Sequence, residues 1–369
     1  MIDSVRAWVE ERLAEEVRRR GGIVGAVVIG ASKAASGKVT FLFLGKDARP
    51  VVVAKVARTP AGEAALLAEH DALRTVRSTG AEVVLTSAPE PLALERIQTR
   101  LALVTSALPG VPMLTRYYTP GHTADPGRVG ADLRAAGSWL LRFHSETRCG
   151  ETELGEEGLE AWVHPVIRRY RAEIGWSDAE GALFGAVLAR ARALRDTPLP
   201  LSAVHGDYWM GNLLMTGDDI GGVLDWERGQ GRALPFRDVY KFPTSYGFYL
   251  DRAYPGRGRV PGHRSREEEA ARWRRFGTWT NLPGFGYAYF GRGWFPEQVR
   301  RFVVDHLEAL GVPAAANAVF FPLFLAEQAM TLDVRAFREG YRSLLIAFWE
   351  ERASTWLWSE SPAEATSSR

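Results

Sequence analysis

Hydrophobic residues recur with two different spacings along the first hundred residues, and the spacing predicts where helices and strands lie. The charged segment 3–20 predicts a helix, with Asp3 or Ser4 at its start and Gly21-Gly22 at its end. Short runs rich in β-branched residues follow, separated by turn-forming residues, which is typical of strands. We expect strands at 23–29, 38–44 and 51–56 in an antiparallel sheet, a helix over 61–77, and a further strand at 101–106.

The rest of the chain is predicted to be mostly helical. A helix that begins at Pro126 carries apolar residues with a period of 3.6, and further helices are expected at 157–174 and 178–195. Two apolar strands follow, and helices continue to about residue 353. This pattern indicates an α+β protein with an N-terminal part, 1–106, that holds the sheet, and a mostly helical part, 107–360. The polar segment 361–369 is expected to be a disordered tail.

Composition narrows the class of protein. The chain has 369 residues, 46% hydrophobic and 24% charged, with a net charge of +2, which is ordinary for a globular protein of one large or two medium domains. Its single cysteine, Cys149, excludes an internal disulfide and favours a reducing compartment. No stretch reaches the roughly 18 apolar residues of a membrane span. We therefore expect a cytoplasmic protein without a membrane partner.

One basic cluster, Arg18-Arg19-Arg20, raises the question of nucleic-acid binding. It stands at the end of the first predicted helix, where cations interact favourably with the helix dipole and with solvent. We therefore expect no nucleic-acid partner.

The segment from Val204 to Glu227 carries the candidate chemistry. An apolar strand leads into a loop with Asp207, Asn212 follows five residues later, and Asp225 comes at the end of the next apolar strand. Phosphoryl transfer to a hydroxyl needs a carboxylate to orient the attacking oxygen and accept its proton, and oxygen ligands for the magnesium ions that neutralise phosphate charge. The residue types predict Asp207 as the base, with Asn212 and Asp225 as Mg²⁺ ligands.

The order of these motifs resembles a known family. The chain reads HGDYWMGN at 205–212, VLDWE at 223–227 and GRALPFRD at 231–238. This set is similar to the signature of the aminoglycoside phosphotransferase and choline-kinase-like group of small-molecule kinases. The resemblance implies a bilobal, protein-kinase-like fold, with a small N-lobe holding an antiparallel sheet and one αC-type helix, and a larger, mostly helical C-lobe. It also implies ATP or GTP as phosphoryl donor, Mg²⁺, and a hydroxylated small molecule as acceptor.

Lys55 is predicted to bind the nucleotide. It lies within the apolar run 51–57, where a lysine is costly unless its ammonium meets a negative group. In the resembling family it would contact the α- and β-phosphates. The helix over 61–77 offers Glu63 and Glu69 as acids to hold it, and we expect Glu69, because Glu63 lies in the first turn. The alternative is a lysine on an edge strand that faces solvent.

Two other segments are expected to contact the nucleotide. The loop 30–37 joins the first two strands where a kinase covers its phosphates, so the Ser32 and Ser36 hydroxyls are candidate ligands, although a plain hairpin turn would have the same sequence. Residues 104–107 would form the hinge against which the base of the nucleotide lies, with Ser106 among the binding residues.

Supporting roles are expected for two motif residues. His205 lies two residues before the predicted base, at the end of a strand, where its ring would hold the backbone near Asp225 and take no part in the chemistry. In the family, the residue that matches Asp238 braces the catalytic loop, and we expect the same here. Gly206 and Gly211 permit backbone angles that other residues avoid.

The acceptor is less well defined. Residues 240–295 include 15 aromatic side chains, which would either form core packing or wall a pocket for a ring or an organic cation. Five arginines lie in the same region, and they favour a neutral or anionic hydroxylated metabolite over a polycation: Arg252, Arg257, Arg259, Arg264 and Arg266. A sugar, an aminoglycoside-like molecule or a natural-product intermediate are the candidate classes.

A protein kinase and a pseudokinase are the alternatives to a small-molecule kinase. A protein kinase is disfavoured, since only 12 residues separate Asp225 from Asp238, too few for a long activation segment. A nucleotide-binding pseudokinase with a scaffold or regulatory role is the alternative to an enzyme. The intact set of Lys55, Asp207, Asn212 and Asp225 favours the enzyme. The sequence leaves open whether the protein is a monomer or a homodimer.

Overall fold

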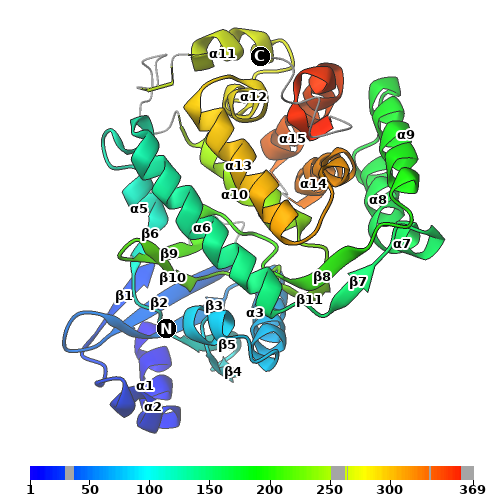
Figure 1. Cartoon of the computed structure of the whole chain (residues 1–369). Coiled ribbons are helices and arrows are strands. Elements are labelled where there is room, and N and C mark those ends of the chain that lie inside the picture. The colour runs from blue at the N-terminus through cyan, green and yellow to red at the C-terminus, as the bar shows by residue number, and fades with distance from the viewer. Residues whose placement is uncertain (30–36, 251–261, 264, 332–333, 359–369) are drawn as a thin grey trace. The chain divides into compact units, whose positions relative to one another are not determined.

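The computed structural model describes residues 1–29, 37–250, 262–263, 265–331 and 334–358. The chain divides into two compact units (Figure 1). The first comprises residues 1–115, 142–147 and 203–233, and the second comprises residues 116–141, 148–202 and 234–369. The segment with Asp207, Asn212 and Asp225 belongs to the first unit. The expected lobe boundary at residues 106 and 107 stays a prediction, and the expected tail at 361–369 lies outside the described residues.

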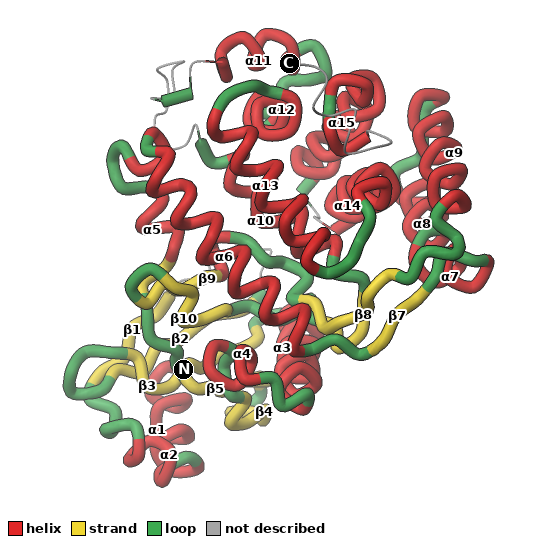
Figure 2. Tube along the Cα trace, viewed as in Figure 1, coloured by secondary structure: helices red, strands yellow, loops and turns green. Residues whose placement is uncertain are grey.

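Among the described residues, the first unit has a five-stranded sheet and four α-helices that lie wholly within it, and α5 (Met113–Tyr117) begins in it and ends in the second unit (Figure 2). Its elements are α1 (Ile2–Arg12), α2 (Ala14–Arg19), β1 (Gly25–Ile29), β2 (Lys38–Leu44), β3 (Pro50–Ala57), α3 (Pro60–Ser78), α4 (Glu82–Ser87), β4 (Pro91–Ile97), β5 (Arg100–Ser106) and β6 (Val111–Pro112). Residues 203–233, called the motif segment below, add the short 3-10 helix η3 (Met210–Asn212) and the strands β9 (Leu213–Thr216), β10 (Asp219–Val223) and β11 (Gln230–Ala233).

The prediction of one helix over residues 3–20 is wrong. The backbone leaves the helical region at Leu13, with φ −114° and ψ 28°, so that α1 and α2 are separate helices. Val5 and Val9 of α1 and Val17 of α2 all lie in the same hydrophobic core, so both helices pack against it. The strand expected from residue 23 begins at Gly25, whereas β2, β3 and α3 match their predictions to within one residue at either end.

The large sheet is antiparallel throughout, with strand order β1-β2-β3-β5-β4. The strand β3 therefore pairs on both sides, so Lys55 does not lie on an edge strand. The strand β4 was not predicted, because Pro91–Ile97 mixes apolar and charged residues without alternation and its burial is correspondingly irregular.

The two faces of this sheet differ in character. Side chains on one face, including Phe41, Phe43 and Val56, are buried with the valines of α1 and α2. On the other face Lys55 lies opposite Thr40 of β2 and Leu103 of β5, and the helix α3 covers part of this face through Leu66. The apolar face fixes the register of the sheet, and that register directs Lys55 toward the helix with the candidate acid.

The second unit is mostly helical. The elements that lie in it wholly or mainly are η2 (His122–Ala124), α6 (Pro126–Glu146), β7 (Gly150–Thr152), α7 (Glu156–Trp162), α8 (His164–Glu173), α9 (Asp178–Ala193), β8 (Leu199–Val204), α10 (Phe236–Phe248), α11 (Ser265–Arg274), α12 (Leu282–Phe290), α13 (Trp294–Ala309), η4 (Ala314–Ala316), α14 (Asn317–Thr331), α15 (Arg335–Glu351), η5 (Arg352–Ser354) and η6 (Trp356–Trp358). The helix expected over 157–174 is wrong as a single element, because Val163 separates α7 from α8.

Aromatic residues form the centre of the second unit. The helix α10 packs against α12, α13 and α14, and its Phe236 stacks on Phe320 with ring centroids 3.9 Å apart. Most of the aromatic residues described between 240 and 295 are buried, among them Tyr240, Tyr246 and Trp273. Core packing is therefore the main role of this aromatic-rich segment.

Within the part of the chain that the structure describes, no single helix is both long and apolar enough to cross a membrane. The bent pair Trp294–Ala309 and Ala314–Thr331, with an angle of 117°, meets the length and hydropathy criteria only when the two are joined.

Candidate functional site

A glycine in a left-handed conformation opens the loop that carries Asp207. The strand β8 ends at Val204, and Gly206 has a φ of +78°. A Cβ atom added to Gly206 would lie 2.3 Å from the carbonyl oxygen of Arg228. The position therefore requires glycine both for its backbone angle and for the close approach of the neighbouring chain.

We expect Gly206→Ala to lower the free energy of unfolding by about 2 kcal/mol or more, because it adds a steric clash to the roughly 1–2 kcal/mol cost of left-handed backbone. Turnover should also fall, since Asp207 is the next residue. Urea denaturation and steady-state kinetics measure the two effects. Gly217→Ala is the matched control: Gly217 has a φ of +64° but no atom within 4 Å of an added Cβ. Equal losses of stability in both variants would contradict the role assigned to the close contact.

His205 connects the loop to the strand end that precedes Asp225. Its Nε2 atom lies 2.9 Å from the carbonyl oxygen of Leu224, so Nε2 carries the proton and Nδ1 accepts the N–H of Asp207 at 3.2 Å. The ring is fully buried and meets Trp226 edge-to-face, with centroids 4.7 Å apart. These contacts use both ring nitrogens to hold backbone groups.

Asn212 ties the same loop together from the other side. Its Nδ2 atom donates to the carbonyl oxygen of Asp207 at 3.0 Å and lies 3.4 Å from Asp207 Oδ2. Its backbone carbonyl accepts the N–H of Leu224 at 2.8 Å. The segment with Asp207 and Asn212 is therefore hydrogen-bonded directly to the residue before Asp225.

Lys55 bridges two carboxylates. Its Nζ atom lies 2.6 Å from Glu69 Oε1 and 2.7 Å from Asp225 Oδ1. Glu69 is only 2% exposed, and its Oε2 atom has no hydrogen-bond partner among the described residues. Glu63, the other candidate acid on α3, pairs instead with Arg96 at the surface. The lysine thus connects α3 to the end of the motif segment.

The charges in this cluster shift the pKa values of its members. Burial alone would lower the pKa of Lys55, but the nearby carboxylates of Glu69 and Asp225 raise it above its ordinary value. The ammonium of Lys55 is the main cause that lowers the pKa of Asp225, with a smaller contribution from Lys38. Both groups therefore stay charged at neutral pH.

Asp225 adopts a backbone conformation that is uncommon for residues other than glycine. Its φ is +65°, and only two other non-glycine residues in the described part of the chain have a positive φ, Ala48 and Gln98. Aspartate and asparagine enter this region more readily than most residues. Unusual backbone angles of this kind are concentrated at functional sites.

Sequence reasoning missed one pair in this cluster. Lys38, at the start of β2, forms a hydrogen bond to Glu227 through its Nζ atom, which also lies 4.0 Å from Asp225 Oδ1. Lys38 lies two residues before Thr40 and therefore on the face that Thr40 shares with Lys55, but this placement depends on the register of β2 and β3, which no local pattern indicates.

Ser106 and Asp238 are the other predicted residues that the structure describes. Ser106 lies at the end of β5, and its Oγ accepts the N–H of Glu90 at 2.9 Å. Asp238 is fully buried in the first turn of α10, in the second unit. Ser32 and Ser36 lie outside the described residues, as do the side chains of the five arginines expected near the acceptor.

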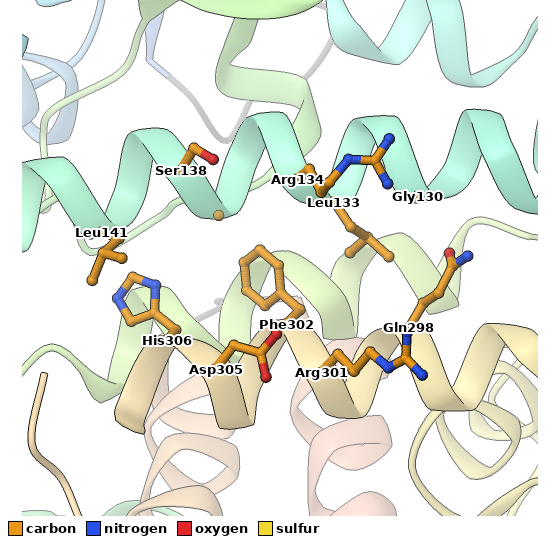
Figure 3. Close-up of a pocket in the computed structure, with 11 residues that line it drawn as sticks. Gly130, Leu133, Arg134, Ser138, Leu141, Gln298, Arg301, Phe302, Asp305 and His306 are labelled. Carbon is orange, nitrogen blue, oxygen red and sulfur yellow. The ribbon is translucent and has the colours of Figure 1, made fainter. Parts of the chain in front are cut away.

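A separate cavity of about 420 Å³ lies between α6 and α13 in the second unit (Figure 3). Phe302 extends from α13 between the two helices, and Ser138, Gln298 and Asp305 are among the polar residues around it. None of the residues predicted for phosphoryl transfer lines this cavity.

Comparisons with known proteins agree with the motifs. The model of the phosphotransferase enzyme family matches residues 32–240, more than half of the chain. The crystal structure of aminoglycoside phosphotransferase APH(4)-Ia is similar with a TM-score of 0.53 and 13% identity, over 98% of this chain and 100% of that one. Among proteins with a curated description, none matches the chain significantly.

Two further solved structures show the same fold. A putative aminoglycoside phosphotransferase from Ralstonia eutropha JMP134 is similar with a TM-score of 0.52 and 15% identity, over 96% of this chain and 99% of that one. The streptomycin–ATP–APH(2")-IIa ternary complex has a TM-score of 0.50 and 12% identity, over 95% of this chain and 98% of that one. The fold is therefore the protein-kinase-like fold of aminoglycoside phosphotransferases. With the family match over the motif segment, the chain belongs to the phosphotransferase enzyme family and is a small-molecule kinase.

Proposed function

We propose that the protein transfers the terminal phosphoryl group of ATP or GTP to a hydroxyl of a small molecule, with Asp207 as the catalytic base. The single observation that carries this proposal is the hydrogen-bonded connection of Asp207, Asn212 and Leu224, which leads directly to the ion pair of Asp225 with Lys55. A carboxylate for the acceptor hydroxyl, oxygen ligands for the cation and a lysine for the donor phosphates are groups that this reaction uses.

The residues present fit Mg²⁺. Because Asn212 donates through Nδ2 to Asp207, its Oδ1 atom is the one suited to a cation, and the carboxylate of Asp225 is ionised. Magnesium takes few protein oxygens and completes its octahedron with phosphate and water. When bound, the cation would offset charge on the transferred phosphoryl group.

Asp207 is proposed to orient the acceptor oxygen and to accept its proton. Lys55, held by Glu69, would contact the donor phosphates. Support for the donor comes from the ATP-bound complex of the related streptomycin-binding phosphotransferase. That complex also supports a hydroxylated acceptor, such as a sugar or an aminoglycoside-like metabolite.

A thermal-shift experiment tests the donor and the metal together. We expect Mg·ATP or Mg·GTP to raise the unfolding midpoint, and the same nucleotide in EDTA to raise it much less, because a ligand stabilises the folded state according to its affinity. The preferred nucleotide is then used to screen sugars, aminoglycosides and other hydroxylated metabolites for release of the diphosphate. An unfolding midpoint that rises equally with and without Mg²⁺ would contradict the proposed metal site. Nucleotide binding without release of the diphosphate in the presence of any acceptor would favour a pseudokinase.

A further inference from the structure

A second lysine shares the face of the sheet that carries Lys55. In the register of β2 and β3, Thr40 lies directly opposite Lys55, and Lys38 lies two residues before Thr40. Opposed residues of an antiparallel pair share one face, and alternate residues of a strand return to that face. Lys38 and Lys55 are therefore diagonal neighbours on the same side of the sheet.

Both lysines are largely buried. The side chain of Lys38 is 12% exposed and that of Lys55 is 16% exposed. A lysine held this far from solvent needs an acidic partner or an anionic ligand. Typical surface lysines remain hydrated and mobile, so the burial of Lys38 indicates a fixed position.

Both lysines lie near Asp225, and each pairs with a further glutamate. Lys55 pairs with Glu69 and with Asp225, whereas Lys38 pairs with Glu227 and lies 4.0 Å from the same Asp225 oxygen. Each lysine thus has one carboxylate of its own, and both flank the carboxylate proposed to bind the cation. Negative and positive side chains therefore alternate in the order Glu69, Lys55, Asp225, Lys38 and Glu227.

We propose that Lys38 is a second phosphate-binding residue, positioned by Glu227, and that it recognises the terminal phosphate of a nucleoside triphosphate; this inference rests on the proposed function. If Lys55 serves the α- and β-phosphates, Lys38 supplies a second ammonium group beside it on the same face, suited to the third phosphate. An ammonium is a compact point charge that binds phosphate oxygens without demanding a fixed plane.

The charge of the cluster supports this assignment. Three carboxylates and two ammonium groups leave one net negative charge, which a divalent cation at Asp225 would more than offset. Asp225 then becomes a weaker partner for both lysines, and phosphate oxygens would take its place. Glu227 keeps Lys38 at its position during this exchange, as Glu69 does for Lys55. In this arrangement the role of Glu227 is to position Lys38.

A purely structural role for Lys38 makes a different prediction. If its pairing with Glu227 only fastens β2 to the segment after β10, its loss should weaken all nucleotides alike through the fold. If it binds the terminal phosphate, its loss should weaken triphosphates selectively. The ratio of triphosphate to diphosphate affinity therefore separates the two roles.

Calorimetric titration with Mg²⁺ and AMP-PNP, ADP, GMP-PNP or GDP provides the test. We expect Lys38→Met to weaken the preferred triphosphate analogue about tenfold or more, and the matching diphosphate by less than about threefold. Glu227→Gln should reduce the ratio of triphosphate to diphosphate affinity by a smaller factor than Lys38→Met does. Lys38→Arg should keep most of the wild-type ratio. Lys46→Met is the matched control, because Lys46 is exposed in the turn between β2 and β3; it should leave both affinities unchanged.

An unchanged ratio in Lys38→Met, with both affinities lowered equally or not at all, overturns the inference. A wild-type protein that binds neither nucleotide overturns the proposed function and the inference together. Asp207→Asn separates the remaining cases: if this variant still transfers phosphate while Lys38→Met has lost its triphosphate selectivity, the assigned base is wrong and the role of Lys38 stands.

Discussion

Replacing Asp207 with asparagine is expected to lower turnover by about 10²- to 10⁴-fold, the range that a positioned general base contributes. Asparagine has nearly the same shape but cannot accept the proton of the acceptor hydroxyl. Affinity for Mg·nucleotide should stay within about threefold of wild type, because Asp207 is proposed to serve the acceptor and not the donor. Single-turnover kinetics with a productive acceptor, together with nucleotide titration, measure the two quantities.

The control for this variant is Asp219→Asn, which makes the same chemical change at an exposed position at the start of β10. It should leave turnover and nucleotide affinity unchanged. Substantial turnover by Asp207→Asn would remove Asp207 from the role of base. A parallel loss of nucleotide binding would instead show that the variant has disturbed the loop that Asn212 and His205 hold.

The second large effect is expected for Lys55→Met. Glu69 is 2% exposed, and removal of the ammonium leaves its carboxylate buried without its hydrogen-bonded counter-ion. Breaking a buried pair by removing one partner costs about 3–5 kcal/mol in favourable cases, and a loss of about 2–4 kcal/mol is expected here because the lysine keeps some contact with solvent. Chemical denaturation measures the loss, and nucleotide titration should show weakened binding in the same variant.

A double variant separates stability from function. Lys55→Met with Glu69→Gln removes the unpaired buried charge, so it should recover part of the stability lost by Lys55→Met alone, but not nucleotide affinity or turnover. Arg96→Met is the comparison at the surface, where the exposed pair with Glu63 contributes little. A double variant that regains activity along with stability would show that Lys55 supports only the fold.

The stability contributed by this cluster should also be constant across neutral pH. The pKa of Lys55 is raised above its ordinary 10.5, so its contribution is fully present below about pH 10.5 and is lost only as the pH rises through the folded value. The pKa of Asp225 is lowered below its ordinary 3.8, so its contribution is present above that pH and is lost as the pH falls. The stability penalty of Lys55→Met should therefore be the same from about pH 5 to pH 9.

The sequence was sufficient to predict the groups whose signal is local. Asp207 and Asn212 are five residues apart, and the contacts between them follow from one short loop. Lys55 was indicated by its apolar neighbours, since a charge within such a run needs a partner. Glu69 is 14 residues from Lys55, and it was favoured over Glu63 because Glu63 lies in the first turn of α3. Strands β2 and β3 were equally clear because their apolar residues are continuous or alternate.

The rest depended on contacts between distant parts of the chain. Lys38 and Glu227 are 189 residues apart, and only the sheet register together with the course of the motif segment brings them into contact. The break at Leu13 has no proline or glycine to indicate it, and Val17 beyond the break packs into the same core as Val5 and Val9. Such features are set by tertiary packing, which overrides local propensity.

The left-handed backbone at Asp225 limits which amino acids evolution or a designer can place there. A substitution that preserves the turn must come from the few residues that tolerate a φ of +65°, chiefly glycine, asparagine and aspartate. Of these, glycine has no side chain to offer a ligand, and asparagine offers an oxygen without the charge. Asparagine is therefore the substitution of choice for asking how much that charge matters, because alanine or glutamate would change the shape of the chain at the same time.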